Sequence, residues 1–259
     1  MSRIYSLLDQ GLTNPEQGTQ EWLDGRKGRI TGSKPGDLYF NFKQESDWDE
    51  ILEKWFGDAV EDFDAVSLKR MAWGTKHEDT AAQVIVDNIP GSHFFECPQM
   101  PINEIYAASP DGAIIVLNNG SEERVEKGSL KKEDVKWHAN VEIKCPGGGI
   151  GKTPEEMRDM ILKKWKTAAP YYMIQIHMEM AAQGVSETLF VVWTPLLTRM
   201  WKIPFNRSFW NLCLEVLENF RQKNVPFEVM LSKVQKLKRR CFGVSNFPIW
   251  KEVNTVYKE

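Results

Sequence analysis

The sequence predicts a mixed α/β fold in which a central mixed β-sheet is flanked by helices. Short apolar runs of the kind that form strands recur through the middle of the chain, and the clearest is Ala-Ile-Ile-Val-Leu at residues 113–117. Longer segments with apolar residues at helical spacing lie before, between and after these runs, for example at residues 67–87. Segments of both kinds in one chain favour a sheet covered by helices over an all-helical or all-β architecture.

Composition describes an ordinary globular protein. The 259 residues suffice for one large domain, and the hydrophobic and charged fractions of 42% and 27% are typical of folded chains. A net charge of −3 argues against a simple basic DNA-coating protein, but it is compatible with an enzyme whose acids face metal ions. The four cysteines form no Cys-x-x-Cys pair, which indicates reduced thiols; a zinc or iron–sulfur site built from distant cysteines is the alternative.

The location and domain organisation follow from the same survey. Residues 1–10 lack a cationic, apolar signal pattern, and no apolar run approaches the ~20 residues of a membrane span. We therefore expect a soluble, intracellular protein of the cytoplasm or nucleus, with no membrane contact. The expected organisation is a single domain over residues 1–224, with a polar surface insertion at 118–138 and a basic C-terminal extension at 225–259.

Hydrophobic periodicity and turn residues mark the expected helices and strands along the chain. Helices are expected at residues 1–30, 46–56, 67–87, from Pro154 onward, 171–183 and 208–223. Strands are expected at residues 93–97, 105–109, 113–117, 141–144, 188–193 and 200–205. The basic amphipathic run at 233–240 suits either a phosphate backbone or a neighbouring subunit.

Two segments place acids and an amine where chemistry is possible. Glu142 and Lys144 share one face of the expected strand because side chains alternate, while Ile143 points the other way. Asp111 lies on a turn favoured by the Pro and Gly beside it. Two carboxylates that converge with one lysine suit metal-assisted phosphodiester cleavage, because oxygen ligands hold Mg²⁺ and the metal activates water. A cross-strand salt bridge on a half-exposed strand is the alternative.

Further polar residues lie on expected helices. Glu78 falls on the stripe of residues 67–87 that we expect to face inward, so it needs either a metal or a lysine as a partner. Gln175 and Glu179 are one helical turn apart and can reach the same site. Ser33 is expected to cap a short helix, which with Arg26 would suit a phosphate; a plain cap and a surface cation are the alternatives.

A glycine-rich segment at residues 146–153 approaches the phosphate-binding P-loop pattern. It departs from that pattern at its first position, where Pro146 replaces glycine. The expected alternative is a loop followed by a helix, with Thr153 as the N-cap, Pro154 in the first turn and Glu156 completing a capping box.

Taken together, the motifs resemble the phage lambda exonuclease or YqaJ-type viral recombinase family of the PD-(D/E)XK nuclease superfamily. The resemblance extends over roughly residues 20–205 and rests on five motifs in chain order. They are Trp22-x-x-x-Arg26-x-Gly28-x-Ile30-Thr31-x-Ser33, Ala72-Trp73-Gly74-x-x-x-Glu78, Ser109-Pro110-Asp111-Gly112, Glu142-Ile143-Lys144-Cys145-Pro146 and Tyr172-Met173-x-Gln175-x-His177.

The resemblance implies a role for each matching residue. Asp111, Glu142 and the backbone carbonyl of Ile143 would hold a catalytic Mg²⁺, for which Mn²⁺ can substitute. Glu78 would serve a second metal ion or its waters, so that one or two ions act per site, and Lys144 would align or activate the attacking water. The residues that would bind the terminal 5′-phosphate or the scissile phosphate are Arg26, Ser33 and Gln175.

The implied activity is a Mg²⁺-dependent 5′-to-3′ exonuclease that degrades linear double-stranded DNA from its ends. Its products would be 5′-mononucleotides and a 3′ single strand for recombination or repair. Partners implied by the resemblance are 5′-phosphorylated duplex ends, a single-strand annealing protein and further copies of the chain in a trimeric ring. Alternatives are a related endonuclease, a P-loop-like nucleotide-binding protein and a non-catalytic DNA-end module.

Overall fold

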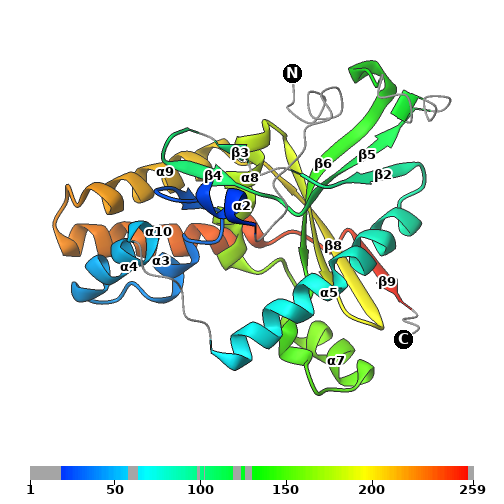
Figure 1. Ribbon diagram of the computed structural model, residues 1–259, viewed down its shortest axis with the longest axis horizontal. Coiled ribbons are helices and arrows are strands. Elements are labelled where there is room, and N and C mark those ends of the chain that lie inside the picture. The colour runs from blue at the N-terminus through cyan, green and yellow to red at the C-terminus, as the bar shows by residue number, and fades with distance from the viewer. Residues whose placement is uncertain are drawn as a thin grey trace.

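A six-stranded mixed sheet forms the centre of the computed structural model (Figure 1). β6 and β7 are parallel, whereas the other neighbouring pairs in this sheet are antiparallel. The structure describes residues 19–57, 64–97, 100–101, 103–118, 124–125 and 130–255. The spatial order of the strands is β2 (Ser92–Phe95), β5 (Gly112–Leu117), β6 (Val135–Lys144), β7 (Glu187–Trp193), β8 (Leu197–Pro204) and β9 (Lys251–Asn254).

A smaller sheet lies beside the central one. In it, β4 (Tyr106–Ala108) pairs with β1 (Ile30–Thr31) in parallel and with β3 (Met100–Pro101) in antiparallel orientation. The carbonyl of Ile105 accepts a hydrogen bond from the Ile30 amide at 2.7 Å. The pairing therefore brings the Ile30-Thr31 segment next to the chain that leads into Asp111.

Helices cover the faces of the central sheet because each face is apolar. α5 (Ala65–Asn88) packs Ala81 and Ile85 against inward residues of β5, β6 and β7. α8 (Met173–Gln183) belongs to a second, larger core together with α9 (Arg207–Gln222) and α10 (Phe227–Ser245). Figure 1 shows α9 and α10 gathered with α3 (Gly36–Phe40) and α4 (Ser46–Phe56) on one side of the molecule. The shorter elements are α2 (Gln20–Asp24), α7 (Pro154–Lys164), η1 (Lys132–Asp134), η2 (Gly147–Gly149) and η3 (Pro170–Tyr172).

Several local predictions are confirmed. Thr153 caps α7, and its hydroxyl accepts a hydrogen bond from the Glu156 amide at 3.3 Å while the Glu156 carboxylate accepts one from the Thr153 amide at 2.8 Å. Pro154 occupies the first turn of this helix. Gly184 ends α8 in the left-handed conformation, with φ of 66°, which glycine adopts without strain.

Other local predictions are wrong. The helix expected at residues 1–30 covers only Gln20–Asp24 within the described part, and residues 1–18 lie outside it. Ser33 does not cap α3. The helix begins at Gly36, and Pro35 holds the N-cap position. The buried residues of α5 are His77, Ala81 and Ile85, so the face of the helix that packs inward differs from the expected one. Leu68 and Met71, which the helical spacing predicted to face inward, are 52% and 51% exposed.

The insertion and the C-terminal segment are both built into the fold where the structure describes them. Residues 135–138 of the expected surface insertion belong to β6, and residues 119–123 and 126–129 lie outside the described part. In the C-terminal segment, α10 buries Val234 and Leu237 in the larger core, and β9 pairs with β8. Among the described residues, no helix has the length and apolar character needed to cross a membrane.

A candidate active site at the ends of β5 and β6

The register of β5 and β6 brings two distant acids together. Gly112 pairs with Val141 in this antiparallel ladder, so the next step along it places Asp111 opposite Glu142. The Ile143 amide donates a hydrogen bond of 2.6 Å to Asp111 Oδ2. The predicted convergence of Asp111 with the Glu142-Ile143-Lys144 segment is therefore present in the structure.

Side-chain alternation along β6 separates the site from the apolar core, as predicted. Glu142 is fully buried, and its carboxylate forms an ion pair with the Lys144 ammonium. Ile143 points to the opposite face, where it packs in the core that lies under α5. The Lys144 Nζ atom lies 4.7 Å from the centroid of the Tyr172 ring, which closes one side of the site.

Gln175 reaches the acids from α8. Its Nε2 donates a hydrogen bond of 2.6 Å to Glu142 Oε1, the same oxygen that Lys144 contacts. Gly32, in the turn after β1, lies directly on Gln175, and a Cβ atom built on it would be 3.2 Å from Gln175 Cγ. Such a contact is tighter than side chains normally make, so glycine allows the turn to approach α8 closely.

Two further acids belong to the same electrostatic group. Glu78 is partly buried on α5; burial raises its pKa, Lys144 opposes this effect, and Glu142 adds to it. Glu179 is fully buried on α8, and burial followed by the charges of Glu142 and Asp111 raises its pKa well above the ordinary value. The side chain of Gln175 interacts with Glu179, yet neither carboxyl oxygen has a partner in hydrogen-bond geometry in the described structure.

The pKa values of the central pair show how strongly these charges interact. Burial, followed by the charge of Glu142, raises the pKa of Asp111 well above its usual range, and Lys144 opposes this shift. Burial alone would lower the pKa of Lys144, but the nearby carboxylates, Glu142 first, raise it well above its ordinary value. Burial also raises the pKa of the Cys145 thiol to about 12, which makes it a poor nucleophile.

The donor set suits a divalent cation that brings some of its own ligands. Four carboxyl groups (Asp111, Glu142, Glu78 and Glu179) surround one ammonium, and Glu142 Oε2 is buried without a hydrogen-bond partner in the described part. Excess buried negative charge is costly unless a cation or protons neutralise it. No three His, Cys, Asp or Glu residues in the described ranges are arranged to hold a metal by themselves. Carboxylate oxygens are the ligands that hard divalent cations use, together with waters and substrate oxygens.

Arg26 and Ser33 lie on either side of β1, which precedes the turn that approaches Gln175. Arg26 donates a 3.1 Å hydrogen bond to Thr31 Oγ1, and its guanidinium lies 4.2 Å from the centroid of the Trp22 ring. Ser33 is exposed in the turn that contains Gly32. Gln175, the third residue predicted to bind phosphate, contacts the acids through its hydrogen bond to Glu142.

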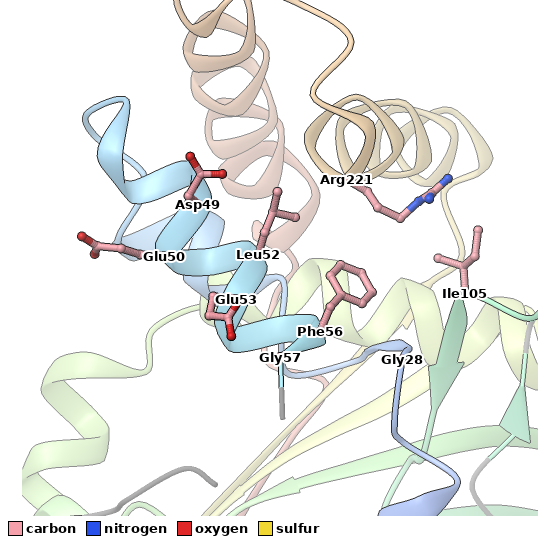
Figure 2. A pocket seen from close by; sticks show the side chains of 9 residues that line it. All are labelled: Gly28, Asp49, Glu50, Leu52, Glu53, Phe56, Gly57, Ile105 and Arg221. Atoms are coloured by element: carbon pink, nitrogen blue, oxygen red, sulfur yellow. The ribbon is translucent and has the colours of Figure 1, made fainter. Parts of the chain in front are cut away.

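A pocket of about 850 Å³ opens elsewhere, where α4 faces α9 (Figure 2). Figure 2 shows Asp49, Glu50 and Glu53 on α4 around one side and Arg221 on the other. None of the predicted site residues lines this pocket. Hydrophobic side chains and three acids give it no evident chemistry, so the candidate site is defined by its side-chain geometry and not by the size of a cavity.

Glu179 is the residue that sequence reasoning left out of the site. Its helical spacing from Gln175 indicated that both could face one site, but the five motifs do not include it. The signal was present in the sequence: a glutamate within the apolar run Met178-Glu179-Met180-Ala181-Ala182 has no exposed face on which to lie.

Comparisons with known proteins give a family and a fold. The family model of the YqaJ-like viral recombinase domain matches residues 21–186. A search of curated proteins finds no match. The crystal structure of the alkaline exonuclease LHK-Exo from Laribacter hongkongensis aligns with a TM-score of 0.51 and 20% identity, covering 87% of this chain and 99% of that one. Its complex with dAMP aligns with a TM-score of 0.50 and 21% identity over the same shares of the two chains.

Proposed function

Because the chain belongs to the YqaJ-like viral recombinase domain family, we propose that it is a divalent-metal-dependent exonuclease acting on the ends of linear double-stranded DNA. The observation that carries this proposal is the meeting of Asp111, Glu142 and Lys144 at the ends of two paired strands. The fold shared with an alkaline exonuclease supports it.

The residues of the proposed site have different roles. Asp111, Glu142 and the Ile143 carbonyl would hold Mg²⁺, or Mn²⁺ in its place, and Glu78 would serve a second ion or the waters of the first. When bound, the metal lowers the pKa of water and shields the negative charge of the phosphate. The Lys144 ammonium, fixed by its contacts with Glu142 and the Tyr172 ring, orients the attacking water.

Residues beside the proposed metal ligands keep Glu142 in place and receive the DNA end. Gln175 holds one oxygen of Glu142 by its hydrogen bond, which leaves the unpartnered Oε2 for the metal. Arg26, Ser33 and Gln175 together bind the 5′-phosphate or the scissile phosphate. Capture of a 5′-phosphate would set the polarity as 5′ to 3′, with 5′-mononucleotides and a 3′ single strand as products.

The partners and the assembly belong to the same proposal. A 3′ single strand is the substrate of a single-strand annealing protein, which we propose as a partner in recombination or repair inside the cell. A ring of three copies that encloses the duplex would keep the enzyme on its substrate between cleavage events. Native mass measurement of the purified chain tests the trimer directly.

Digestion of two DNA forms tests the proposed activity. With Mg²⁺, linear duplex labelled at its 5′-phosphorylated end should lose the label as a mononucleotide, and covalently closed circular duplex should stay intact. Nicking or linearisation of the circle would identify an endonuclease instead. Stable binding of the linear duplex without any degradation in Mg²⁺ or Mn²⁺ would identify a non-catalytic DNA-end module.

A comparison of duplexes with 5′-phosphate and 5′-hydroxyl ends tests the phosphate pocket. The initial rate should be higher on the phosphorylated end, and the difference should disappear in Arg26→Ala, because the guanidinium supplies charge-assisted donors to the phosphate. Equal initial rates on both ends with the unaltered protein would contradict the role given to Arg26, Ser33 and Gln175.

A further inference from the structure

Four aromatic rings from three separate elements form a connected cluster at the surface. Tyr39 and Phe40 come from α3, Tyr171 from η3 and Phe242 from α10. The centroid of the Tyr39 ring lies 5.1 Å from that of Phe40, 6.3 Å from that of Tyr171 and 6.5 Å from that of Phe242. Phe40 and Tyr171 are also 5.1 Å apart. We call these four residues the surface aromatic cluster.

The cluster is open to solvent on its outer side. Phe40 is 50% exposed and Phe242 is 60% exposed, although both rings are large and apolar. Single exposed apolar residues are normal on protein surfaces. Phe40 and Phe242 are instead joined through Tyr39, which both rings contact, and connected exposed apolar groups are typical of binding sites.

On its inner side the cluster continues to the proposed active site. Tyr171 and Tyr172 have ring centroids 4.3 Å apart, and the Lys144 ammonium lies 4.7 Å from the centroid of Tyr172. The Tyr172 ring is stacked at 12° on Trp165, with 6.2 Å between the centroids, so its orientation is fixed. A row of rings therefore leads from solvent to Lys144, the lysine that we propose orients the attacking water.

Positive charge accompanies the rings. The Lys238 ammonium lies 5.8 Å from the centroid of the Tyr39 ring. Burial, followed by the charge of Lys43, lowers the pKa of Lys238. Lys43 itself lies three residues after the end of α3. Lys238 belongs to the basic run at 233–240, which the proposed function leaves without a role. Flat apolar rings beside an ammonium group suit a ligand that carries both flat groups and negative charges.

We propose that the surface aromatic cluster is a stacking platform for single-stranded DNA, with bases on the rings of Phe40 and Phe242 and a phosphate near Lys238. Aromatic rings within a cationic groove are the usual way to bind unpaired strands without sequence preference, because every base has a flat face. A duplex hides those faces, so the platform selects the unpaired strand. The inference rests on the proposed function, since degradation of one strand leaves the other unpaired beside Lys144.

Fluorescence anisotropy with a labelled oligothymidylate tests the platform in EDTA, where no digestion is expected. Phe242→Leu keeps an apolar side chain and removes the ring, whereas Phe242→Tyr keeps the ring. The dissociation constant should rise about 5- to 100-fold in Phe242→Leu, the range that loss of one base–ring stack implies. Phe242→Tyr should bind like the unaltered protein, and Phe40→Leu should resemble Phe242→Leu.

The matched control is an exposed aromatic residue that also stands beside a lysine but lies outside the cluster. Trp250 is 41% exposed, and the Lys202 ammonium lies 4.2 Å from its ring centroid. Trp250→Leu should leave the dissociation constant unchanged. An equal loss of affinity in Trp250→Leu would show a general effect of removing exposed rings and would overturn the assignment to the cluster.

A measurement on the unaltered protein avoids any dependence on how the variants fold. An abasic strand of the same length carries the same phosphates without bases, so it should bind at least about fivefold more weakly. Equal binding of abasic and ordinary strands would overturn the proposal. Light scattering provides a second test. If Phe242→Leu breaks an oligomer and its affinity for single strands stays the same, the cluster is an interface between copies and the proposal is overturned.

These outcomes are separate from those of the proposed function. A protein that binds single strands through their bases in EDTA but never digests duplex with Mg²⁺ or Mn²⁺ would retain the platform and lose the exonuclease assignment. A protein that digests duplex normally but binds abasic and ordinary strands alike would retain the exonuclease assignment and lose the platform.

Discussion

At the scale of single residues, the proposed site depends on the carboxylate of Glu142. It is fully buried, one oxygen is held by Gln175 and Lys144, and the other has no described hydrogen-bond partner. A buried carboxylate normally satisfies both oxygens. The unpartnered oxygen therefore points to a ligand that binds there when the protein works.

Two substitutions test the catalytic assignments. Glu142→Gln removes a negative charge of the proposed metal site, and Lys144→Ala removes the donor that we propose orients water. Each substitution should therefore lower the digestion rate by about 10²-fold or more. Binding of linear duplex, measured by gel shift in EDTA, should survive in both. Circular dichroism checks that the variants fold, and Lys233→Ala on α10 is the control lysine. Mg²⁺-dependent digestion at an undiminished rate in either variant would remove that residue from the mechanism.

A glycine-to-alanine pair tests how closely the turn after β1 approaches the site. A Cβ atom at Gly32 would be 3.2 Å from Gln175 Cγ, whereas one at Gly36 would meet nothing within 4 Å. Gly32→Ala should displace Gln175 by a few tenths of an ångström and lower the digestion rate about tenfold, because small misplacements near reacting groups are costly. Gly36→Ala should digest duplex at the original rate. The same rate in both variants would show that Gln175 tolerates the displacement.

At the scale of elements, α8 presents a polar stripe to the sheet. Gln175, Glu179 and Gln183 follow one another at one-turn spacing, and all three lie toward the interior. Across from them, β6 contributes Asn140 and Glu142, which are fully buried. Several of these polar atoms have no described partner. Ordered water or a cation would satisfy them, since buried polar groups are seldom left unpaired.

Glu179→Gln tests the energetic cost of this stripe. Burial raises the pKa of Glu179 in the folded protein. The contribution of this carboxyl to the free energy of unfolding is therefore smaller at high pH than at low pH. Its stabilising effect is complete below the unfolded pKa of about 4.3 and is lost as pH rises through the folded value. Glu179→Gln should therefore raise the unfolding free energy of the metal-free protein at pH 8 by about 1–3 kcal/mol.

Urea denaturation in EDTA at pH 5 and pH 8 checks this prediction. The gain should be larger at pH 8 than at pH 5, because Glu179 ionises freely in the unfolded chain while burial opposes its ionisation in the folded protein, and the substitution removes this difference. Glu50→Gln on the exposed side of α4 is the control and should change little. A loss of stability at pH 8 in Glu179→Gln would mean that the carboxylate is stabilised by a partner.

At the scale of the whole molecule, the C-terminal strand closes the sheet. β9 pairs with β8, and Glu252 binds the Arg199 side chain at 2.6 Å. Arg199 is only 8% exposed and also donates to the Trp165 carbonyl at 2.9 Å. β9 thus supplies the carboxylate that pairs with the buried Arg199 guanidinium. It also covers the edge of β8, which is almost wholly buried.

Truncation tests the contribution of this strand. Removal of residues 251–259 should lower the unfolding free energy by about 2–4 kcal/mol and promote aggregation, because β8 becomes an unprotected edge and Arg199 loses its carboxylate. Removal of residues 256–259 alone keeps β9 and is the control. Urea denaturation and light scattering measure both effects, and equal midpoints for the two truncations would show that β9 is dispensable.

Much of the fold could be predicted because its elements carry local signals. The apolar run at 113–117 and the capping residues Thr153 and Glu156 depend on neighbours in the sequence, and the structure has them where expected. The buried side of α5 was misjudged because the sheet covers only part of the helix, which leaves Leu68 and Met71 outside the core. β9 was missed because four residues of mixed polarity become a strand only when an edge is available to pair with.

The sequence by itself determined which residues could form the site and which of them share a face. Alternation along one strand suffices to place Glu142 and Lys144 together and Ile143 apart. Tertiary structure alone decided that Asp111 meets Glu142, that Gln175 binds its carboxylate and that Glu179 lies behind it. Those contacts depend on strand register and helix packing between segments far apart in the chain, and no local pattern encodes a distance between them.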